Sequence, residues 1–514
     1  MTQLLPIVLV AAVMAVNGGV SPLGATWPLP DWLIWMLMWL TPALLVALAA
    51  LGLRRFIRQL RRGTVPGPLI RADRIMRVTR WLIVAIGLAS VLLIDGLGTI
   101  RRVTGNLILV DELLAIAPAL LAVTATWWVY YPIENLLTEA MLIRRLDTGQ
   151  PTYPTLTRGQ YVLLQARLHL LLMLVPVLMI AGFSEAIDDA WTRWRLDAPG
   201  AREALTALVA GGVFLFSPLL AKGLLDVQSL PQGSLRDMLV EVCRRHRIGV
   251  RDLLLWRTNG SMINAAVMGV IAPLRYVLIT DALLEMLQEP QVRAVMAHEV
   301  GHVRRHHMVW MIVCLLACFT LAAHVVGWSI VMLETSRYWS NDFESIATIG
   351  VAALQLVLGL TLFGWVCRRF ERQADTFAVQ HLSGLATPLE RDARVSPEAV
   401  QAMHAALATI SELNTVDPAR HSWRHGSIHW RQMYLQSIIG RPLLRLPIDR
   451  LVRWLKVASA IVLALGIAYQ IMAREAVQGD SAPRFARTKG NSLLHGDRSS
   501  AKAAVERLAS EASQ

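Results

Sequence analysis

Two histidines and a glutamate stand in the spacing of a zinc-binding hydrolase, in the run His298-Glu299-Val300-Gly301-His302. Residues four apart share one face of an α-helix, so both imidazoles can reach a single cation. Glu299 lies between them and can take a proton from a water at that cation. The run therefore predicts a catalytic zinc site with Glu299 as general base.

The residues around this run favour a helix. Glu289-Pro290 suits a helix start, because proline is tolerated in the first turn, and only Gly301 interrupts the helix-forming sequence that follows. The alternative interpretation is a surface helix that carries two histidines without a metal. His307, nine positions after His298, faces another direction on a continuous helix, and we expect it at the membrane interface beside Arg304 and Arg305.

A catalytic zinc usually takes three protein ligands and leaves one position open. A second helical run, Arg368 to Asp375, places Glu371 and Asp375 four apart and so on one face. We expect Glu371 to be the third ligand and Asp375 to accept the second N–H of a zinc-bound imidazole, which fixes its tautomer. The alternative is a charged helix end in which Glu371 pairs with Arg368.

The composition indicates a membrane protein. Of 514 residues, 55% are hydrophobic and only 17% are charged, which is too apolar for a soluble chain of this length. About nine apolar runs are long enough, or nearly so, to span a bilayer. They are Leu4 to Val16, Leu33 to Leu53, Trp81 to Ile100, Leu113 to Tyr131, Tyr161 to Phe183, Leu205 to Leu225, Met308 to Leu333, Ile346 to Val366, and Val457 to Met472.

Arginine placement predicts the orientation of these spans. The loop 54–80 is dense in arginine, which marks the cytoplasmic side, and counting onward places the zinc helix on that side as well. Segments 184–204 and 334–345 then lie outside. Four arginines are exceptions to the charge rule, because they would also lie outside: Arg101, Arg102, Arg193 and Arg195. The net charge of +13 is spread over such loops without a nucleic-acid-binding motif, so no nucleic-acid partner is expected.

The four cysteines, Cys243, Cys314, Cys318 and Cys367, are scattered along the chain. Their spacing fits neither a disulfide framework nor a zinc knuckle. We expect them to be core residues of a protein in a reducing compartment.

The fold class expected from these patterns is mainly α. Residues 1–225 form an N-terminal membrane region with about six spans, and 226–307 form a catalytic part with a small β-meander and the zinc helix. A transmembrane hairpin at 308–366 leads to a second catalytic part at 367–450, a last span at 451–473 and a flexible polar tail at 474–514. The meander comprises Leu253 to Trp256, Ile263 to Met268 and Tyr276 to Thr280, followed by a short helix, Asp281 to Leu287.

The sequence resembles peptidase family M48, the integral-membrane zinc endopeptidases that include the CAAX prenyl protease and HtpX. The resemblance is carried by the run from His298 to His302, by Arg368 with Glu371 and Ala374-Asp375, and by Asn264-Ala265, and it covers about residues 230–435. It implies a cytoplasmic α+β metalloprotease domain of the zincin type, in the gluzincin group. It also implies that Asn264-Ala265 begins an edge strand on which the substrate backbone lies; an ordinary strand start is the alternative.

The same resemblance points to His425, with Arg431 six residues later. In the family this histidine approaches the zinc site, where it would help to stabilise the oxyanion. This chain has Gly426 where the family commonly has proline, and His421 and His429 are nearby alternatives.

The expected function is therefore an integral-membrane zinc metalloendopeptidase that binds one Zn²⁺ per chain and hydrolyses peptide bonds with a zinc-activated water. Its partners would be protein or peptide substrates and the bilayer of a bacterial inner membrane, with a role in membrane-protein quality control. Activity should fall in mild acid, since zinc-binding histidines must be neutral. Alternatives are CAAX-type processing of lipidated peptides, or a transporter or scaffold with a structural metal.

Overall fold

The structure, a computed structural model, describes residues 5–17, 22, 29–62, 67–147, 149, 152–196, 198, 200–334, 341–384, 393–414 and 416–481. The chain divides into two compact units, Met1–Ser459 and Ala460–Gln514, and the boundary falls within helix α16 (Pro447–Ser481). Everything that positions the candidate site belongs to the first unit.

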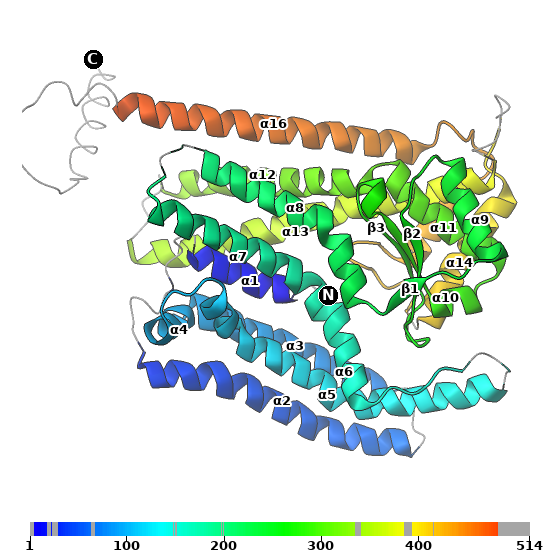
Figure 1. Cartoon of the computed structure of the whole chain (residues 1–514), viewed down its shortest axis with the longest axis horizontal. Helices are drawn as coiled ribbons and strands as arrows, with labels where there is room; N and C mark the ends of the chain where they lie inside the picture. The colour runs from blue at the N-terminus through cyan, green and yellow to red at the C-terminus, as the bar shows by residue number, and fades with distance from the viewer. Residues whose placement is uncertain are drawn as a thin grey trace, which may run out of the picture. The chain divides into compact units, whose positions relative to one another are not determined.

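The described chain is mainly helical, as predicted (Figure 1). Eight of the described helices are long and apolar enough to cross a membrane. The first helix, α1, is apolar but has only 13 residues. The helices before the sheet are α1 (Leu5–Asn17), α2 (Asp31–Arg61), α3 (Gly67–Leu92), α4 (Gly96–Thr104), α5 (Val110–Asp147), α6 (Arg158–Ala166), α7 (Leu172–Arg193) and α8 (Ala201–Leu224).

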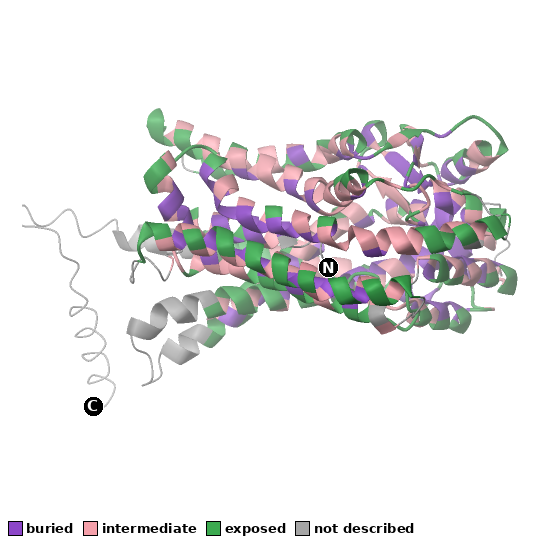
Figure 2. Ribbon diagram, turned by 90° about the horizontal axis from the view of Figure 1, so that it is seen from below, coloured by how far each residue is buried: buried purple, intermediate pink, exposed green. Residues whose placement is uncertain are grey.

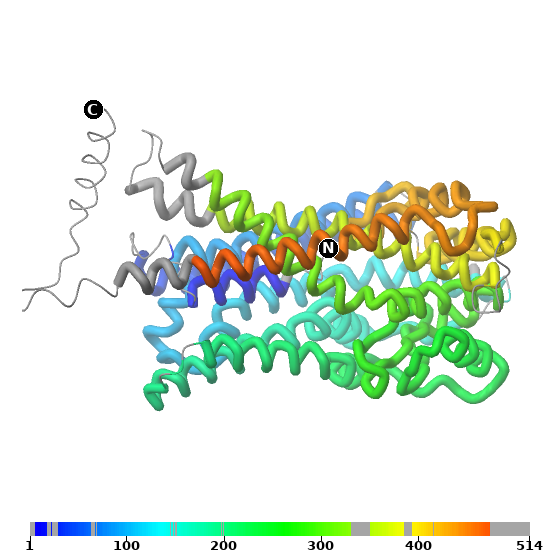
Figure 3. Tube along the Cα trace, turned by 90° about the horizontal axis from the view of Figure 1, so that it is seen from above, coloured from blue at the N-terminus to red at the C-terminus, as the bar shows by residue number. Residues whose placement is uncertain are grey.

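The long helices leave large apolar side chains uncovered. Trp32, Leu208 and Trp328 are each exposed over about two thirds or more of their surface, at 67%, 72% and 71%. Figure 2 shows exposed residues running along the outer faces of these helices. Apolar surface on this scale needs a lipid solvent, which agrees with a polytopic membrane protein. Helices α7 and α8 pack side by side (Figure 1 and Figure 3).

One predicted membrane span does not have the predicted bounds. The run from Trp81 to Ile100 does not form one helix, because α3 ends at Leu92 and a separate short helix, α4, begins at Gly96. Asp95 between them has a positive φ of 53°. A Cβ on Gly96 would lie 2.6 Å from the carbonyl oxygen of Ser90, so the close turn requires glycine.

Two of the four arginines that are exceptions to the charge rule form ion pairs with nearby carboxylates. Arg101 pairs with the buried side chains of Asp111 and Glu112, while Arg102 pairs with Asp31 and Asp95. Ion pairing of this kind lowers the cost of placing an arginine near the end of a span.

The sheet has four strands in the order β1-β2-β4-β3, comprising β1 (Val227–Ser229), β2 (Asp252–Trp256), β3 (Ala265–Met268) and β4 (Tyr276–Thr280). The predicted meander is wrong, because β2 pairs with β4 in parallel and β3 is left at the edge. The carboxylate of Asp281, directly after β4, accepts hydrogen bonds from the backbone N–H groups of Thr258 and Asn259, directly after β2, and so connects the ends of these two strands. Sequence reasoning also missed β1.

The catalytic part packs around one apolar core. Buried residues of α9 (Ser234–Arg245), β4, α11 (Glu289–Arg304), α13 (Asn341–Leu382) and α14 (Pro397–Leu413) form it together. Every residue of β4 is buried. The remaining described helices are α10 (Asp281–Met286), α12 (His307–Glu334) and α15 (Ile428–Ser437), and all four cysteines are buried and free, as predicted.

Candidate active site

Two helices carry the predicted ligand residues. α11 begins at Glu289 with Pro290 in its first turn, as predicted, and the Gln288 side chain forms a capping box with Gln291. α13 continues from the second span of the hairpin α12–α13, whose helices pack against each other, and carries Glu371 and Asp375. Gly301 lets the two helices approach, because a Cβ there would lie 3.0 Å from the ring of Phe377.

The donor atoms of His298, His302 and Glu371 lie together. One ligand atom from each falls within 4.8 Å of the other two. The Nε2 atoms of the two histidines are 3.2 Å apart, and each lies 3.8 Å from a carboxylate oxygen of Glu371. Two imidazoles and one carboxylate are the donor set of a catalytic zinc with an open position, so these residues fit the ion that the sequence predicted.

Burial keeps one of these imidazoles in the form that binds metal. It lowers the pKa of His302 to about 4, so this side chain is neutral at physiological pH. Burial also lowers the pKa of His298, but the carboxylate of Asp375 outweighs that effect and raises it overall. A metal ligand must be unprotonated at the coordinating nitrogen, and a neutral His302 meets this condition.

Asp375 is fully buried and lies beside His298, as predicted. Its Oδ1 is 2.9 Å from Nδ1 of His298, the nitrogen that faces away from Glu371. The same carboxylate accepts two hydrogen bonds from the guanidinium of Arg431, at 2.5 and 2.7 Å. Nη1 of Arg431 lies 3.7 Å from Glu371 as well. The arginine thus orients the carboxylate that orients the histidine.

Glu299 lies between the cluster of His298, His302 and Glu371 and the edge strand. Its Oε2 accepts a hydrogen bond from the backbone N–H of Val267 in β3, at 3.1 Å. Burial raises the pKa of Glu299 to about 7, although the neighbouring His298 lowers it. A carboxylate with a pKa near the working pH is suited to accept and return a proton.

Asn264 and Ala265 stand at the start of that edge strand. The backbone of Asn264 pairs with Thr280 of β4, accepting a hydrogen bond from its N–H at 3.0 Å. In an antiparallel pair, alternate residues face the partner strand, so Ala265 and Val267 direct their backbone groups to the free edge. Val267 uses its N–H for Glu299, and the edge runs directly beside the candidate catalytic residue.

His425 approaches the same cluster from the loop before α15. Its Nδ1 lies 3.0 Å from Oε2 of Glu371, and 53% of its side chain is exposed. Gly426 beside it has a positive φ of 75°, a conformation that glycine adopts without strain and proline cannot. Of the three candidate histidines in this segment, the contact with the cluster is made by His425.

The prediction that His307 lies at the membrane interface is wrong. It is fully buried, stacks on Phe370, and its Nδ1 lies 3.0 Å from Nδ1 of His302. The prediction assumed one continuous helix, but α11 ends at Arg304 and His306 has a φ of 56°, so α12 starts in a new direction at His307. On the other side, Nε2 of His307 is 2.9 Å from Gln373, whose amide donates to Asp449 at 2.7 Å.

Sequence reasoning therefore missed a polar chain from His302 through His307 and Gln373 to Asp449. Its members lie far apart in the sequence, and no spacing rule connects them. The one available signal was the pair of polar residues, His307 and Gln373, at the membrane ends of two apolar helices.

Comparison with known proteins finds similarity over the part that holds this site. The profile of peptidase family M48 matches residues 230–412. A protease named HtpX from Xanthomonas euvesicatoria is 30% identical over 230 residues, which are 41% of this chain and 75% of that protein. A protease HtpX homolog from Aeropyrum pernix is 27% identical over 251 residues, covering 45% of this chain and 74% of the relative.

Two further proteins are also similar to this chain. A CAAX prenyl protease 1 homolog from Arabidopsis thaliana is 28% identical over 160 residues, 29% of this chain, and the match spans 37% of that relative. The solved structure of S. mikatae Ste24p is 15% identical and superposes with a TM-score of 0.43, covering 79% of this chain and 98% of the other.

Proposed function

Since this chain belongs to peptidase family M48 and is a membrane metalloprotease, we propose that it is a zinc endopeptidase with His298, His302 and Glu371 as metal ligands and Glu299 as general base. The observation that supports this most is the convergence of the three donor atoms within 4.8 Å, from two helices joined by a membrane hairpin. A bound Zn²⁺ would polarise the scissile carbonyl and lower the pKa of a water molecule.

The side chains around the ion have separate roles in this proposal. Glu299 accepts the proton of the attacking water and returns it to the leaving amine. Asp375 is a positioning residue, which holds the tautomer of His298 and is itself held by Arg431. His425, half exposed and beside Glu371, donates a hydrogen bond toward the oxygen on which negative charge develops.

The free edge of β3 supports binding of an extended substrate. Asn264 and Ala265 begin this strand, and the backbone groups of Ala265 face outward beside Glu299. Recognition through backbone hydrogen bonds tolerates many side chains. We therefore propose unfolded segments of membrane proteins as substrates, with a quality-control role on the cytoplasmic side of a bacterial inner membrane.

Processing of lipidated peptides is the alternative for the substrate, supported by the match to a protein named CAAX prenyl protease 1 homolog. A mass-spectrometric comparison of membrane proteomes with and without the active chain separates the two. New internal termini in many membrane proteins support quality control. Cleavage confined to lipidated C-terminal peptides supports the alternative.

The first prediction concerns Glu299→Gln. Purified full-length protein should digest casein, and the substitution should abolish digestion while zinc stays bound, because glutamine cannot accept the proton. Zinc is measured on the same sample by mass spectrometry. Glu289→Gln, at the exposed first turn of α11, is the matched control and should keep both zinc and activity. Casein digestion by the pure Glu299→Gln protein would refute the role of Glu299.

A further inference from the structure

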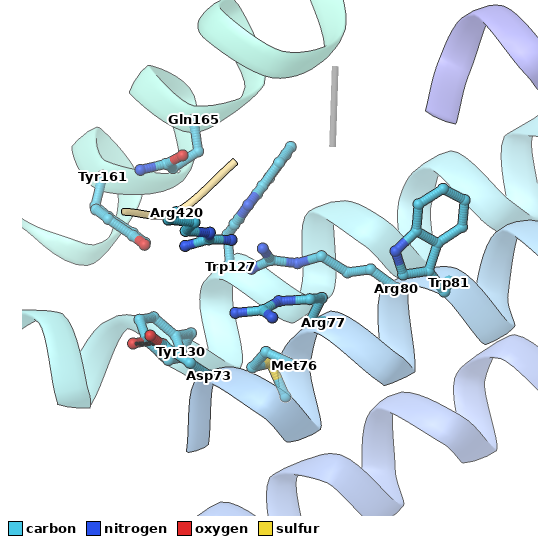
Figure 4. A pocket seen from close by; sticks show the side chains of 10 residues that line it. All are labelled: Asp73, Met76, Arg77, Arg80, Trp81, Trp127, Tyr130, Tyr161, Gln165 and Arg420. Atoms are coloured by element: carbon cyan, nitrogen blue, oxygen red, sulfur yellow. Dashed lines mark hydrogen bonds between the residues drawn. The ribbon is translucent and has the colours of Figure 1, made fainter. Parts of the chain in front are cut away.

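A cavity of about 280 Å³ lies away from the candidate active site, among α3, α5, α6 and the loop that precedes α15. Figure 4 shows the guanidinium groups of Arg77, Arg80 and Arg420 gathered in it. Trp127 and Tyr161 are among the aromatic residues that form its walls.

The residues that line this cavity carry more positive than negative charge. Asp73 is the one carboxylate among the lining residues, and its oxygen accepts a hydrogen bond from Tyr130. Arg80 donates to the hydroxyl of Thr126 at 2.9 Å and lies over the ring of Trp127. Among the described residues, no ion pair is formed by Arg77, Arg80 or Arg420. Three like charges held together repel each other unless an anion lies between them.

The arginine and aromatic side chains of the cavity indicate which kind of anion it would bind. Arginine presents a planar set of N–H donors that matches phosphate oxygens in pairs, and several converging arginines are a typical phosphate site. Arg77 and Arg80 also belong to the arginine-rich segment 54–80, which we predict to face the cytoplasm, where anionic lipids are found. Tryptophan and tyrosine walls are typical of the depth of lipid headgroups.

We infer that this cavity binds a phosphate group, carried by an anionic lipid headgroup or as the free anion. The ligand would contact two parts of the chain that are distant in sequence. Arg77 and Arg80 belong to α3, whereas Arg420 lies in the loop that also carries His425.

That loop is joined to the helix of the candidate active site. The indole N–H of Trp423 donates to the carbonyl oxygen of Leu360 at 3.2 Å, and Arg368 donates to the carbonyl oxygen of Trp423 at 2.8 Å. Both partners belong to α13, the helix of Glu371. A bound phosphate would thus connect the N-terminal membrane region to the loop beside the catalytic cluster, a role separate from peptide hydrolysis.

The test uses the full chain in a neutral detergent and two probes, dioleoyl phosphatidylglycerol and sodium phosphate. Native mass spectrometry counts retained lipid, and thermal unfolding measures stabilisation by each probe, with sodium chloride at equal ionic strength as reference. In the double variant Arg77→Gln/Arg420→Gln, the affinity for the probe that the unmodified chain binds should fall by about tenfold for each arginine removed. Both side chains are exposed, so the variant should fold, and the single variants serve if it does not.

Arg74→Gln is the matched control, since Arg74 is exposed on α3 but does not line the cavity. Stabilisation by phosphatidylglycerol alone identifies a lipid as the source of the phosphate. Stabilisation by sodium phosphate, with displacement of lipid, identifies the free anion. The inference is overturned if the double variant binds both probes as strongly as the unmodified chain and Arg74→Gln do.

Discussion

At the scale of single residues, the site holds the carboxyl group of Glu299 in a buried environment that disfavours its charged form. Glu299 is enclosed between α11 and β3, and burial raises its pKa to about 7 despite the neighbouring His298. The backbone N–H of Val267 holds one of its oxygens and leaves the other for a water molecule. This environment suits a group that must gain and lose a proton in each cycle.

The pH dependence of hydrolysis follows from this value. A general base works only when deprotonated, so kcat/KM should be full above about pH 7 and should fall about tenfold per pH unit below it. The measurement is kcat/KM between pH 5 and pH 9, with zinc content followed at each point so that metal loss is recognised. A flat profile down to pH 5.5 with zinc retained would contradict the assignment of Glu299.

At the scale of elements, the site depends on how closely α11 and α13 approach. Gly301 faces Phe377, and an added Cβ would lie 3.0 Å from the ring. Because the ligands come from both helices, a small separation moves Glu371 away from the two histidines. Tight packing at this one contact therefore determines whether three donors can share an ion.

Gly301→Ala should lower zinc affinity and destabilise the fold by about 1 to 3 kcal/mol, the usual cost of overpacking. Phe377→Leu in the same chain should restore part of the loss by giving the methyl group room. Zinc affinity is measured by competition with a chelator. Gly211→Ala is the control, because nothing lies within 4 Å of a Cβ at that helical position. Equal behaviour of the two alanine variants would count against this packing argument.

The polar chain from His302 through His307 and Gln373 to Asp449 leads to a second prediction at the scale of elements. His307→Phe keeps an aromatic ring against Phe370 but removes the nitrogen beside Nδ1 of His302. Loss of such an outer partner should weaken zinc binding by about 10- to 100-fold. The fold should lose about 1 to 3 kcal/mol, because the buried amide of Gln373 also loses its partner. His429→Phe, on the exposed side of α15, is the control. Unchanged zinc affinity in His307→Phe would show that this contact does not position His302.

The elements differ in how far they could be predicted from sequence. The proximity of His298 and His302 on α11 was predictable, because a four-residue spacing places side chains on one helix face regardless of context. The same rule placed Glu371 and Asp375 on one helix face. The assumed membrane hairpin then brought that helix back beside the first. Strand order was not predictable, because it involves contacts between residues far apart in the sequence, such as the hydrogen bond that the backbone N–H of Thr258 donates to the carboxylate of Asp281. The position of His307 was predicted wrongly because the sequence gives no sign of the positive φ of His306, which ends the helix before His307.

At the scale of the whole molecule, orientation in the membrane decides which proteins the site can meet. The predicted topology places Glu203, in the first turn of α8, outside and Gln232, which follows α8, inside. All four native cysteines are buried, so single added cysteines can be labelled with little background. A membrane-impermeant maleimide on intact cells should label Glu203→Cys at once and Gln232→Cys only after lysis. The reverse pattern would place the site outside the cytoplasm.

The central claim for the whole molecule is that one zinc ion joins α11 to α13. Its most direct test is the zinc content of purified, undegraded chains carrying Glu299→Gln, measured by mass spectrometry with and without Glu371→Ala. We predict one zinc per chain in the first protein and a large loss in the second, with Glu289→Ala as an unaffected control. A metal-free Glu299→Gln chain, or full zinc occupancy without the carboxylate of Glu371, would contradict the account.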